Sequence, residues 1–348
     1  MSVAEQLNTT RSAVIDRFLR SLRSLRVSVL DRCNLRCRYC MPEEDYTWLP
    51  KQDLLTNREI VHVVESFSSL GVDRVRITGG EPLLRGDLTE LIASLSEIRS
   101  IRDIALTTNA TRLAQYAEDL HTAGLQRITV SLDTLDPGRM KFMTGRQVMA
   151  KVREGLETAA AFQFESIKIN TVVIRGFNDD ELCELVLFAK SIGAEIRFIE
   201  YMDVGGATDW SLDQVVGRDE ILKILTNYFG TIKAVGIRGS VPAESFTLED
   251  GTHFGIISSV SNPFCSTCDR SRLTADGMWY LCLYASNGFD LRSRLRRKEN
   301  LSDFIKDIWK KREDRGAENR LKEPQREILY SLTDLKLDPH REMHKRGG

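Results

Sequence analysis

Three of the seven cysteines in this 348-residue chain, Cys33, Cys37 and Cys40, lie within eight residues of one another. Three thiols are an odd number for disulfides and one fewer than a closed zinc site uses. A tight loop of three thiolates can hold three corners of a [4Fe–4S] cluster, whereas a cluster that only transfers electrons normally has four cysteine ligands. The spacing therefore predicts an iron–sulfur site with one iron free to bind another molecule. A three-cysteine zinc knuckle that borrows a fourth ligand is the alternative.

A glycine pair and a serine stand where they could help to bind that molecule. In RITGGEP, residues 76–82, Gly79 and Gly80 end a strand-like run, and glycines let the backbone approach a ligand closely. Glu81 could accept a hydrogen bond from an ammonium group. Ser131 ends a later strand-like run, at residues 127–132.

A second set of three cysteines lies near the other end of the chain. Cys265, Cys268 and Cys282 are separated by two and thirteen residues, and no fourth cysteine falls nearby. Taken alone, this pattern fits a zinc ribbon that lacks one ligand. Taken with the first set, a second cluster with an open iron is the more economical interpretation. We interpret the seventh, Cys183, as a buried structural thiol in a helix.

Basic residues recur in the strand-like runs, where charged side chains are unusual unless they face solvent or a ligand. The net charge is −1, so no global field favours nucleic acid and local placement must account for any anion binding. Cations on successive strands of one barrel can converge in its lumen and bind a polyanion such as a triphosphate; the alternative is that each reaches the surface. These residues are Arg26, Arg74, Arg76, Lys168 and Arg197; two more cations, Arg270 and Arg272, immediately follow Cys268.

The first two-thirds of the chain alternates short β-branched runs with helical patterns, such as the segment that begins with Thr56 and Glu59 in capping-box spacing and ends at Gly71. Six β–α units in series predict a parallel sheet, and their regular spacing favours an incomplete (β/α)6 barrel of the TIM type, open on one side. The six predicted strands are residues 25–30, 74–78, 103–108, 127–132, 167–173 and 195–201.

After residue 205 the pattern changes to a C-terminal α+β region. Antiparallel strands are expected there, with a hairpin turn at Asp276 and Gly277, followed by a charged helical region, 290–322, and a polar tail. The expected division is an N-terminal extension (1–24), a partial barrel (25–205), a cluster-binding region (206–335) and a tail (336–348).

The sequence also bears on the compartment. It contains no apolar run of the roughly 18 residues that a membrane span needs, and its first 26 residues contain no compact apolar segment typical of a secretory signal. A cytoplasmic location is expected, and in that reducing compartment clustered cysteines are more often metal ligands than disulfides.

The cysteine loop, with Tyr39 just before its last cysteine, resembles the cluster loop of the radical S-adenosylmethionine (SAM) enzymes, in which the open iron binds the amino and carboxylate groups of SAM. The complete pattern resembles the molybdenum cofactor biosynthesis protein A (MoaA) family of GTP 3′,8-cyclases. This pattern comprises both cysteine sets, the Arg270-x-Arg272 pair and a terminal Gly-Gly, and the resemblance extends from about Arg26 to Gly348. Asp269, Lys345 and Arg346 depart from the residues usual in that family.

The resemblance implies a role for each matching residue. Two [4Fe–4S] clusters are implied, one on Cys33, Cys37 and Cys40 and one on Cys265, Cys268 and Cys282, the second of which binds a ring nitrogen of guanine. The residues implied to contact SAM are Tyr39, Gly80, Ser131 and Met202. Those implied to contact GTP are Arg26, Arg76, Thr107, Lys168, Arg197, Arg270, Ser271 and Arg272. Gly347 and Gly348 are implied to reach the reacting atoms, together with Arg270 and Arg272.

The implied activity is the conversion of GTP to 3′,8-cyclo-7,8-dihydro-GTP, the first step of molybdenum cofactor biosynthesis. Its implied partners are a flavodoxin- or ferredoxin-like electron donor, or a chemical reductant, and a downstream cyclic pyranopterin monophosphate synthase. A homodimer is possible, and no nucleic-acid or membrane partner is expected. The alternatives are a radical SAM enzyme that modifies a peptide and a zinc-stabilised interaction module that uses the basic stretch 292–322.

Overall fold

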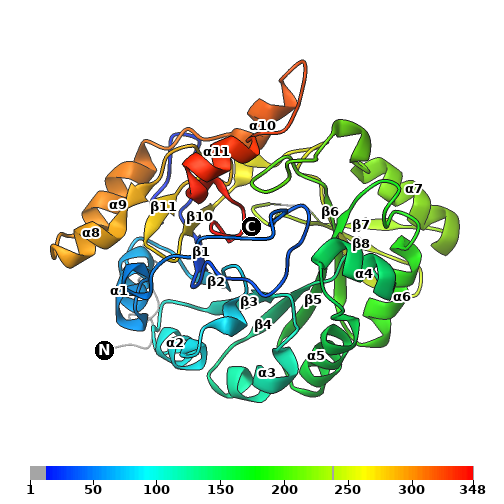
Figure 1. The fold of residues 1–348 in the computed structure, drawn as a ribbon, viewed down its shortest axis with the longest axis horizontal. Coiled ribbons are helices and arrows are strands. Elements are labelled where there is room, and N and C mark those ends of the chain that lie inside the picture. Colours follow the sequence, from blue (N-terminus) through cyan, green and yellow to red (C-terminus); the bar gives the residue numbers. More distant parts are fainter. Residues whose placement is uncertain (1–12, 237–238, 348) are drawn as a thin grey trace, which may run out of the picture.

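The computed structural model describes residues 13–236 and 239–347. In these residues the strands form one twelve-stranded sheet in the order β12-β11-β10-β1-β2-β3-β4-β5-β6-β9-β8-β7, which curves into a barrel surrounded by helices (Figure 1). The strands are β1 (Ser24–Ser28), β2 (Arg74–Thr78), β3 (Asp103–Thr108), β4 (Arg127–Ser131), β5 (Ser166–Val173), β6 (Glu195–Glu200), β7 (Lys233–Val235), β8 (Glu244–Thr247), β9 (His253–Ile257), β10 (Arg270–Leu273), β11 (Met278–Tyr280) and β12 (Phe289–Asp290).

Helices follow the first six strands as predicted. Helix α1 (Asn57–Ser68) begins with the predicted capping box, in which the Thr56 side chain accepts from the Glu59 amide and the Glu59 carboxylate accepts from the Thr56 amide. The other α-helices are α2 (Leu88–Ser96), α3 (Leu113–Thr122), α4 (Pro137–Thr144), α5 (Met149–Ala161), α6 (Leu182–Ser191), α7 (Arg218–Phe229), α8 (Leu291–Arg296), α9 (Leu301–Lys310), α10 (Gly316–Leu321) and α11 (Leu332–Leu337).

The six-unit barrel is confirmed, and the C-terminal region extends it at both edges. β9 pairs parallel with β6, and β10 pairs parallel with β1. The expectation that the C-terminal strands are antiparallel therefore holds for the β7–β8–β9 and β10–β11–β12 pairings but is wrong for β9 and β10 where they join the barrel. The predicted turn joins β10 to β11, and Gly277 adopts a φ of +87° there.

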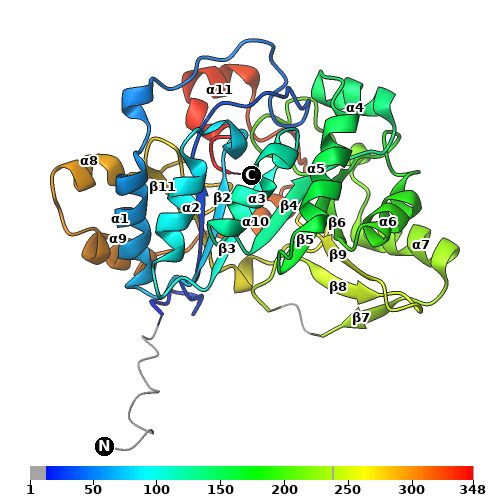
Figure 2. The same cartoon turned by 90° about the horizontal axis from the view of Figure 1, so that it is seen from below.

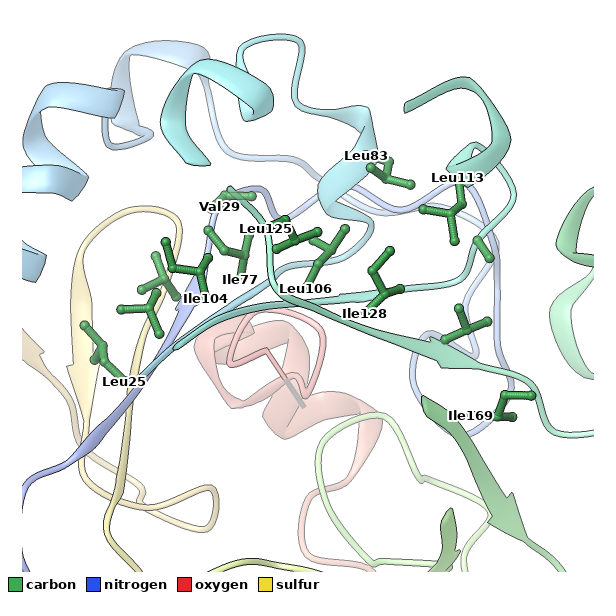
Figure 3. Close-up of a cluster of buried hydrophobic side chains, with 14 of the residues drawn as sticks. Leu25, Val29, Ile77, Leu83, Ile104, Leu106, Leu113, Leu125, Ile128 and Ile169 are labelled. Atoms are coloured by element: carbon green, nitrogen blue, oxygen red, sulfur yellow. The ribbon is translucent and has the colours of Figure 1, made fainter. Parts of the chain in front are cut away.

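Alternation along the strands separates the hydrophobic core from the barrel lumen. Leu25, Ile77, Leu106, Ile128 and Ile169 are fully buried and point outward to the surrounding helices (Figure 3). The residues between them point into the lumen, because successive side chains of a strand face opposite sides. A TIM barrel normally fills this interior with branched apolar side chains, whereas this lumen contains Arg26, Arg76, Thr107, Thr129 and Asn170.

The C-terminal segment closes one end of the barrel. In Figure 1 the red segment that follows α11 lies in the middle of the ring of strands, and in Figure 2 α11 and the loop that follows β1 lie together over the same end. Lys336 of α11 forms an ion pair with Glu43 of that loop at 3.4 Å. No helix in the described ranges is both long and apolar enough to span a bilayer.

Candidate active site

The two cysteine sets meet in one cavity. Its lining includes all six of their thiols, and none of these cysteines forms a disulfide. The first set lies in the loop after β1, whereas the second flanks β10 and β11. Because β10 pairs directly with β1, sequence segments more than 220 residues apart are brought to the same mouth of the barrel. The six cysteines are Cys33, Cys37, Cys40, Cys265, Cys268 and Cys282.

Glycines hold the first cysteine loop in place. The amide of Gly80 donates to the carbonyl of Leu30 at 2.8 Å, and the amide of Glu81 donates to the carbonyl of Arg32 at 2.8 Å. A Cβ on Gly80 would lie 2.3 Å from the Arg32 carbonyl oxygen. The glycine pair therefore packs on the cysteine loop, and Gly80 also lines the cavity.

One thiol of the second set, Cys268, lies in an environment unlike that of the other five. Burial raises the pKa of Cys33 to about 11, and burial together with the neighbouring cysteines raises the pKa of Cys37 and Cys40. Burial would also raise the pKa of Cys268, but Arg270 and Arg312 lower it to about 6. Burial also raises the pKa of Cys265 and Cys282. Among the six cysteines of the cavity, the pKa of Cys268 alone is lowered, which favours the thiolate form that binds metal.

Three guanidinium groups lie side by side in the lumen. Arg26 is paired in register with Arg272 on one side and with Arg76 on the other. Burial and the neighbouring arginines lower the pKa of Arg26, and burial and like charges also lower those of Arg76, to about 9, and Arg272, to about 10. Crowding of like charges in a buried site is costly without an anion, so this row of arginines is suited to binding one.

Most of the other predicted cations and polar contacts also reach the cavity. Arg197 and Arg270 line it, as does Thr107, which accepts from Arg76 Nη1 at 3.3 Å. Lys168 is not among the lining residues; it pairs with Glu195 at 3.0 Å. Ser271 alternates to the opposite face of β10 and is fully buried, so only its backbone could meet a nucleotide. Arg74 pairs with Asp269 instead of facing the cavity.

The four residues predicted to contact SAM, Tyr39, Gly80, Ser131 and Met202, all line the same cavity. The Tyr39 hydroxyl donates to Asp133 Oδ2 at 2.8 Å, which fixes the ring between the cysteine loop and β4. Glu81 does not line the cavity. Its buried carboxylate accepts from Thr108, Asn109 and Leu83, so its role as an ammonium acceptor is not supported.

The C-terminal tail is docked in the site. The carbonyl of Gly347 accepts from Arg26 Nη1 at 3.0 Å and from Arg272 Nη1 at 2.9 Å. Arg346, a departure from the family pattern, is 1% exposed; it donates to the carbonyls of Leu283 and Ala285 and lies over the Tyr280 ring. The basic residue thus anchors the tail. Gly348 lies outside the described residues.

Comparison with known proteins identifies the family. Over 345 residues the chain is 51% identical to GTP 3′,8-cyclase 1 of Mycobacterium tuberculosis, covering 97% of this chain and 96% of that protein. The chain belongs to the GTP 3′,8-cyclase (MoaA) family. It is also 47% identical to the GTP 3′,8-cyclase of Aquifex aeolicus, covering 88% and 95% of the two chains. The Radical SAM superfamily model matches residues 27–189, and the Molybdenum Cofactor Synthesis C model matches residues 194–318.

A solved structure supports the fold assignment. Streptococcus suis SuiB bound to S-adenosylmethionine superposes with a TM-score of 0.61 at 16% identity, over 87% of this chain and 69% of that one. At this identity the likeness shows the fold alone. The chain is accordingly a radical SAM enzyme of the GTP 3′,8-cyclase family, a group that uses a [4Fe–4S] cluster and SAM.

Several residues that support the cyclase site escaped the sequence analysis. Gly206 packs on the carbonyl of Cys40, where a Cβ would lie 2.1 Å away. Arg20 and Arg312 hold the second cysteine set by donating to the carbonyls of Cys265 and Cys268, each at 2.9 Å. The Gly205-Gly206 pair follows a strand, as Gly79-Gly80 does, so the sequence could have indicated that it packs closely against the site. Nothing in the sequence pattern distinguishes Arg20 or Arg312 from a surface arginine.

Asp203, next to the SAM-site candidate Met202, fixes the wall of the cavity. Its fully buried carboxylate accepts from Arg320, Arg326 and Tyr284. We expect Asp203→Asn to lower the free energy of unfolding by about 3 kcal/mol, because removal of one partner leaves buried charge uncompensated. Urea unfolding will measure this loss. Asp219→Asn, at a side chain that is 92% exposed, should have almost no effect; equal effects of the two changes would contradict this role.

Docking of the tail should depend on pH through His340 and Asp276, whose Nε2 and Oδ2 atoms are 2.7 Å apart. The hydrogen bond with Asp276 raises the pKa of His340 above 6.5. The pair therefore stabilises the docked tail fully below pH 6.5, while Asp276 is ionised, and this contribution is lost as the pH rises through the raised pKa. Because the histidine is partly exposed, we expect at most about 1 kcal/mol.

Hydrogen exchange of residues 339–347 at pH 6 and pH 8.5 will measure this effect. Protection should be greater at pH 6 in the wild-type chain, and His340→Gln should remove the difference. An unchanged pH dependence in this variant would contradict the assignment to His340.

Proposed function

We propose that this chain converts GTP to 3′,8-cyclo-7,8-dihydro-GTP by a SAM-dependent radical reaction, the first step of molybdopterin biosynthesis. One observation carries the proposal: a cavity lined by two sets of three cysteines also contains a row of three arginines, Arg272, Arg26 and Arg76. A nucleoside triphosphate matches this arrangement, with anionic phosphates for the arginines and a base within reach of the second cysteine set. The lumen cations also favour a nucleotide over a peptide as substrate.

We assign the first cluster to Cys33, Cys37 and Cys40. All three cysteines line the cavity without disulfides, and Cys33 raises the pKa of both Cys37 and Cys40, as expected of sulfurs grouped around one site. Within the described residues no three His, Cys, Asp or Glu side chains are placed to hold a single metal ion. Cys33, Cys37 and Cys40, which line the cavity, would hold the cluster. With SAM bound, this cluster supplies the 5′-deoxyadenosyl radical.

We assign a second [4Fe–4S] cluster to Cys265, Cys268 and Cys282. The low pKa of Cys268 supports a ligand role, because thiolate is the form that binds metal. These three cysteines would hold the second cluster, and the cluster would supply a binding site for a ring nitrogen of guanine. Radical generation is then assigned to the barrel and base binding to the C-terminal region, on either side of the boundary expected near residue 205.

The chain's own residues act by positioning. Arg26, Arg76 and Arg197 hold the triphosphate, with Thr107 and Lys168 beside them, while Tyr39, Gly80, Ser131 and Met202 hold SAM. Arg270 and Arg272, Ser271 through its backbone, and the Gly347-Gly348 tail complete the nucleotide site. The reaction takes hydrogen from C3′ of GTP and forms a bond from C3′ to C8 of guanine, so its rate depends on how closely these groups hold C3′ to the radical.

The remaining partners follow from this reaction. A cytoplasmic flavodoxin- or ferredoxin-like donor, or a chemical reductant, supplies electrons, and cyclic pyranopterin monophosphate synthase receives the product. A homodimer is the proposed assembly.

Anaerobic incubation of the reconstituted chain with SAM, dithionite and GTP deuterated at C3′ tests the proposal. We expect 5′-deoxyadenosine that carries deuterium and a cyclised nucleotide. Undeuterated 5′-deoxyadenosine without a cyclised product, from a chain with both clusters intact, would overturn it.

A further inference from the structure

A cationic hollow lies on the outer surface beside the first cysteine loop, separate from the catalytic cavity. Its lining includes Asn34 of that loop, Arg112 just before α3, Arg146 between α4 and α5, and Lys151 in α5. Arg146 and Lys151 are exposed, and no acidic residue lines the hollow. Within the described residues, Arg112, Arg146 and Lys151 form no ion pair with a carboxylate, although Arg112 donates to the Leu83 carbonyl and the Tyr116 hydroxyl.

One residue separates this hollow from the cluster site. Leu35 lines both the hollow and the catalytic cavity, and its amide donates to Cys33 Sγ at 3.5 Å. A second connection runs from Asn34, whose Oδ1 accepts from Asn109 Nδ2 at 2.9 Å; the same Nδ2 lies 3.9 Å from Cys33 Sγ. A redox group placed in the hollow is therefore one side chain away from a cysteine of the first set.

We propose that this hollow is the docking site of an acidic electron-transfer protein that reduces the first cluster. The inference rests on the proposed function, which requires an external electron for each cleavage of SAM. The donor loses one electron, the cluster gains one, and no bond of this chain changes in the transfer. Because the chain as a whole carries a charge of only −1, attraction of an acidic partner must come from such a local group of cations.

The surface next to the hollow supports a protein partner over a small anion. Arg38, which follows Cys37, is exposed and lies over the ring of Phe142 at 4.3 Å, and Phe142 is 58% exposed. The amide of Arg38 donates to the carbonyl of Met143 at 3.0 Å, so this pair belongs to the same loop–helix surface. An exposed aromatic ring with an arginine is typical of the centre of a protein interface. Glu154, one turn after Lys151 on α5, is an opposing charge outside the hollow.

The test compares two double variants of the reconstituted full-length chain. Arg146→Glu/Lys151→Glu reverses the charge of the hollow, whereas Lys306→Glu/Lys310→Glu makes the same change on exposed positions of α9, on the other side of the barrel (Figures 1 and 2). Arg146→Gln/Lys151→Gln is the milder form of the first change. Iron content and circular dichroism confirm that each variant is folded and loaded.

The first readout is binding of a purified acidic flavodoxin, measured as Kd by calorimetry at low and at moderate salt. We expect about a tenfold weaker Kd and a smaller salt dependence for the Glu pair, an intermediate value for the Gln pair and no change for the α9 pair. Equal Kd values for the hollow and α9 variants would overturn the inference, whether or not the chain is active.

The second readout is 5′-deoxyadenosine formation with flavodoxin and, separately, with dithionite. The hollow variants should lose the flavodoxin-driven rate and keep the dithionite-driven rate. A parallel loss of both rates would overturn the docking role. Absence of 5′-deoxyadenosine from the wild-type chain with dithionite would instead overturn the proposed function, and the binding measurement would still decide the docking site.

Discussion

Replacement of Gly206 by alanine is expected to lower the occupancy of the first cluster and slow SAM cleavage about a hundredfold, whereas the same replacement at Gly86 should change neither. A Cβ at position 206 would lie 2.1 Å from the carbonyl oxygen of Cys40, and this atom belongs to the backbone and cannot rotate away. The loop must shift, at a cost of roughly 1–3 kcal/mol. A displacement of about 1 Å at a reacting centre costs about a hundredfold in rate.

Iron content and 5′-deoxyadenosine formation measure this effect. A Cβ at Gly86 meets no atom within 4 Å, so Gly86→Ala is a matched control. If Gly206→Ala retains all its iron and its SAM cleavage, then the loop after β6 does not position the cysteine loop as described.

Replacement of Cys268 by serine is expected to halve the iron content, from about eight to about four per chain, because one of two four-iron clusters is lost. Formation of the cyclised nucleotide should fall by more than about a hundredfold, since the base then lacks its anchor. SAM cleavage on the first cluster should persist without a cyclised product.

Cys183→Ser is the matched control for this change. Cys183 is half-buried in α6, packs beside the hydrophobic core and does not line the cavity. This variant should keep about eight irons and full activity. Equal iron loss in both variants would show that Cys268 has no specific role.

The barrel could be predicted because its periodicity is local. Each of the six predicted strands is a short run rich in β-branched residues. The bounds of each strand in the structure agree with the predicted bounds to within a residue or two, as for β2 at Arg74–Thr78. The direction of β9 and β10 could not be predicted, because short apolar runs look alike in parallel and antiparallel sheets. These strands are placed by long-range pairing with β6 and β1.

The candidate site, like the fold, could be predicted from the sequence only in part. Cysteines with close spacing and arginines within strands are visible in the sequence, and their convergence in the lumen follows from strand alternation. The residues that hold the cysteine loops are different: Arg20 and Arg312 act on cysteine carbonyls more than 40 residues away. The way the tail is anchored could not be predicted either, because Arg346 is buried through contacts with Tyr280 and the segment that follows Cys282, which no local pattern encodes.

Iron and acid-labile sulfide per chain, measured after anaerobic reconstitution, decide whether each of the two three-thiol sets holds a cubane cluster at one shared cavity. We expect about eight of each per wild-type chain, and about four of each when Cys33, Cys37 and Cys40 are all replaced by alanine. A wild-type chain that binds one or two zinc ions and no labile sulfide would contradict it.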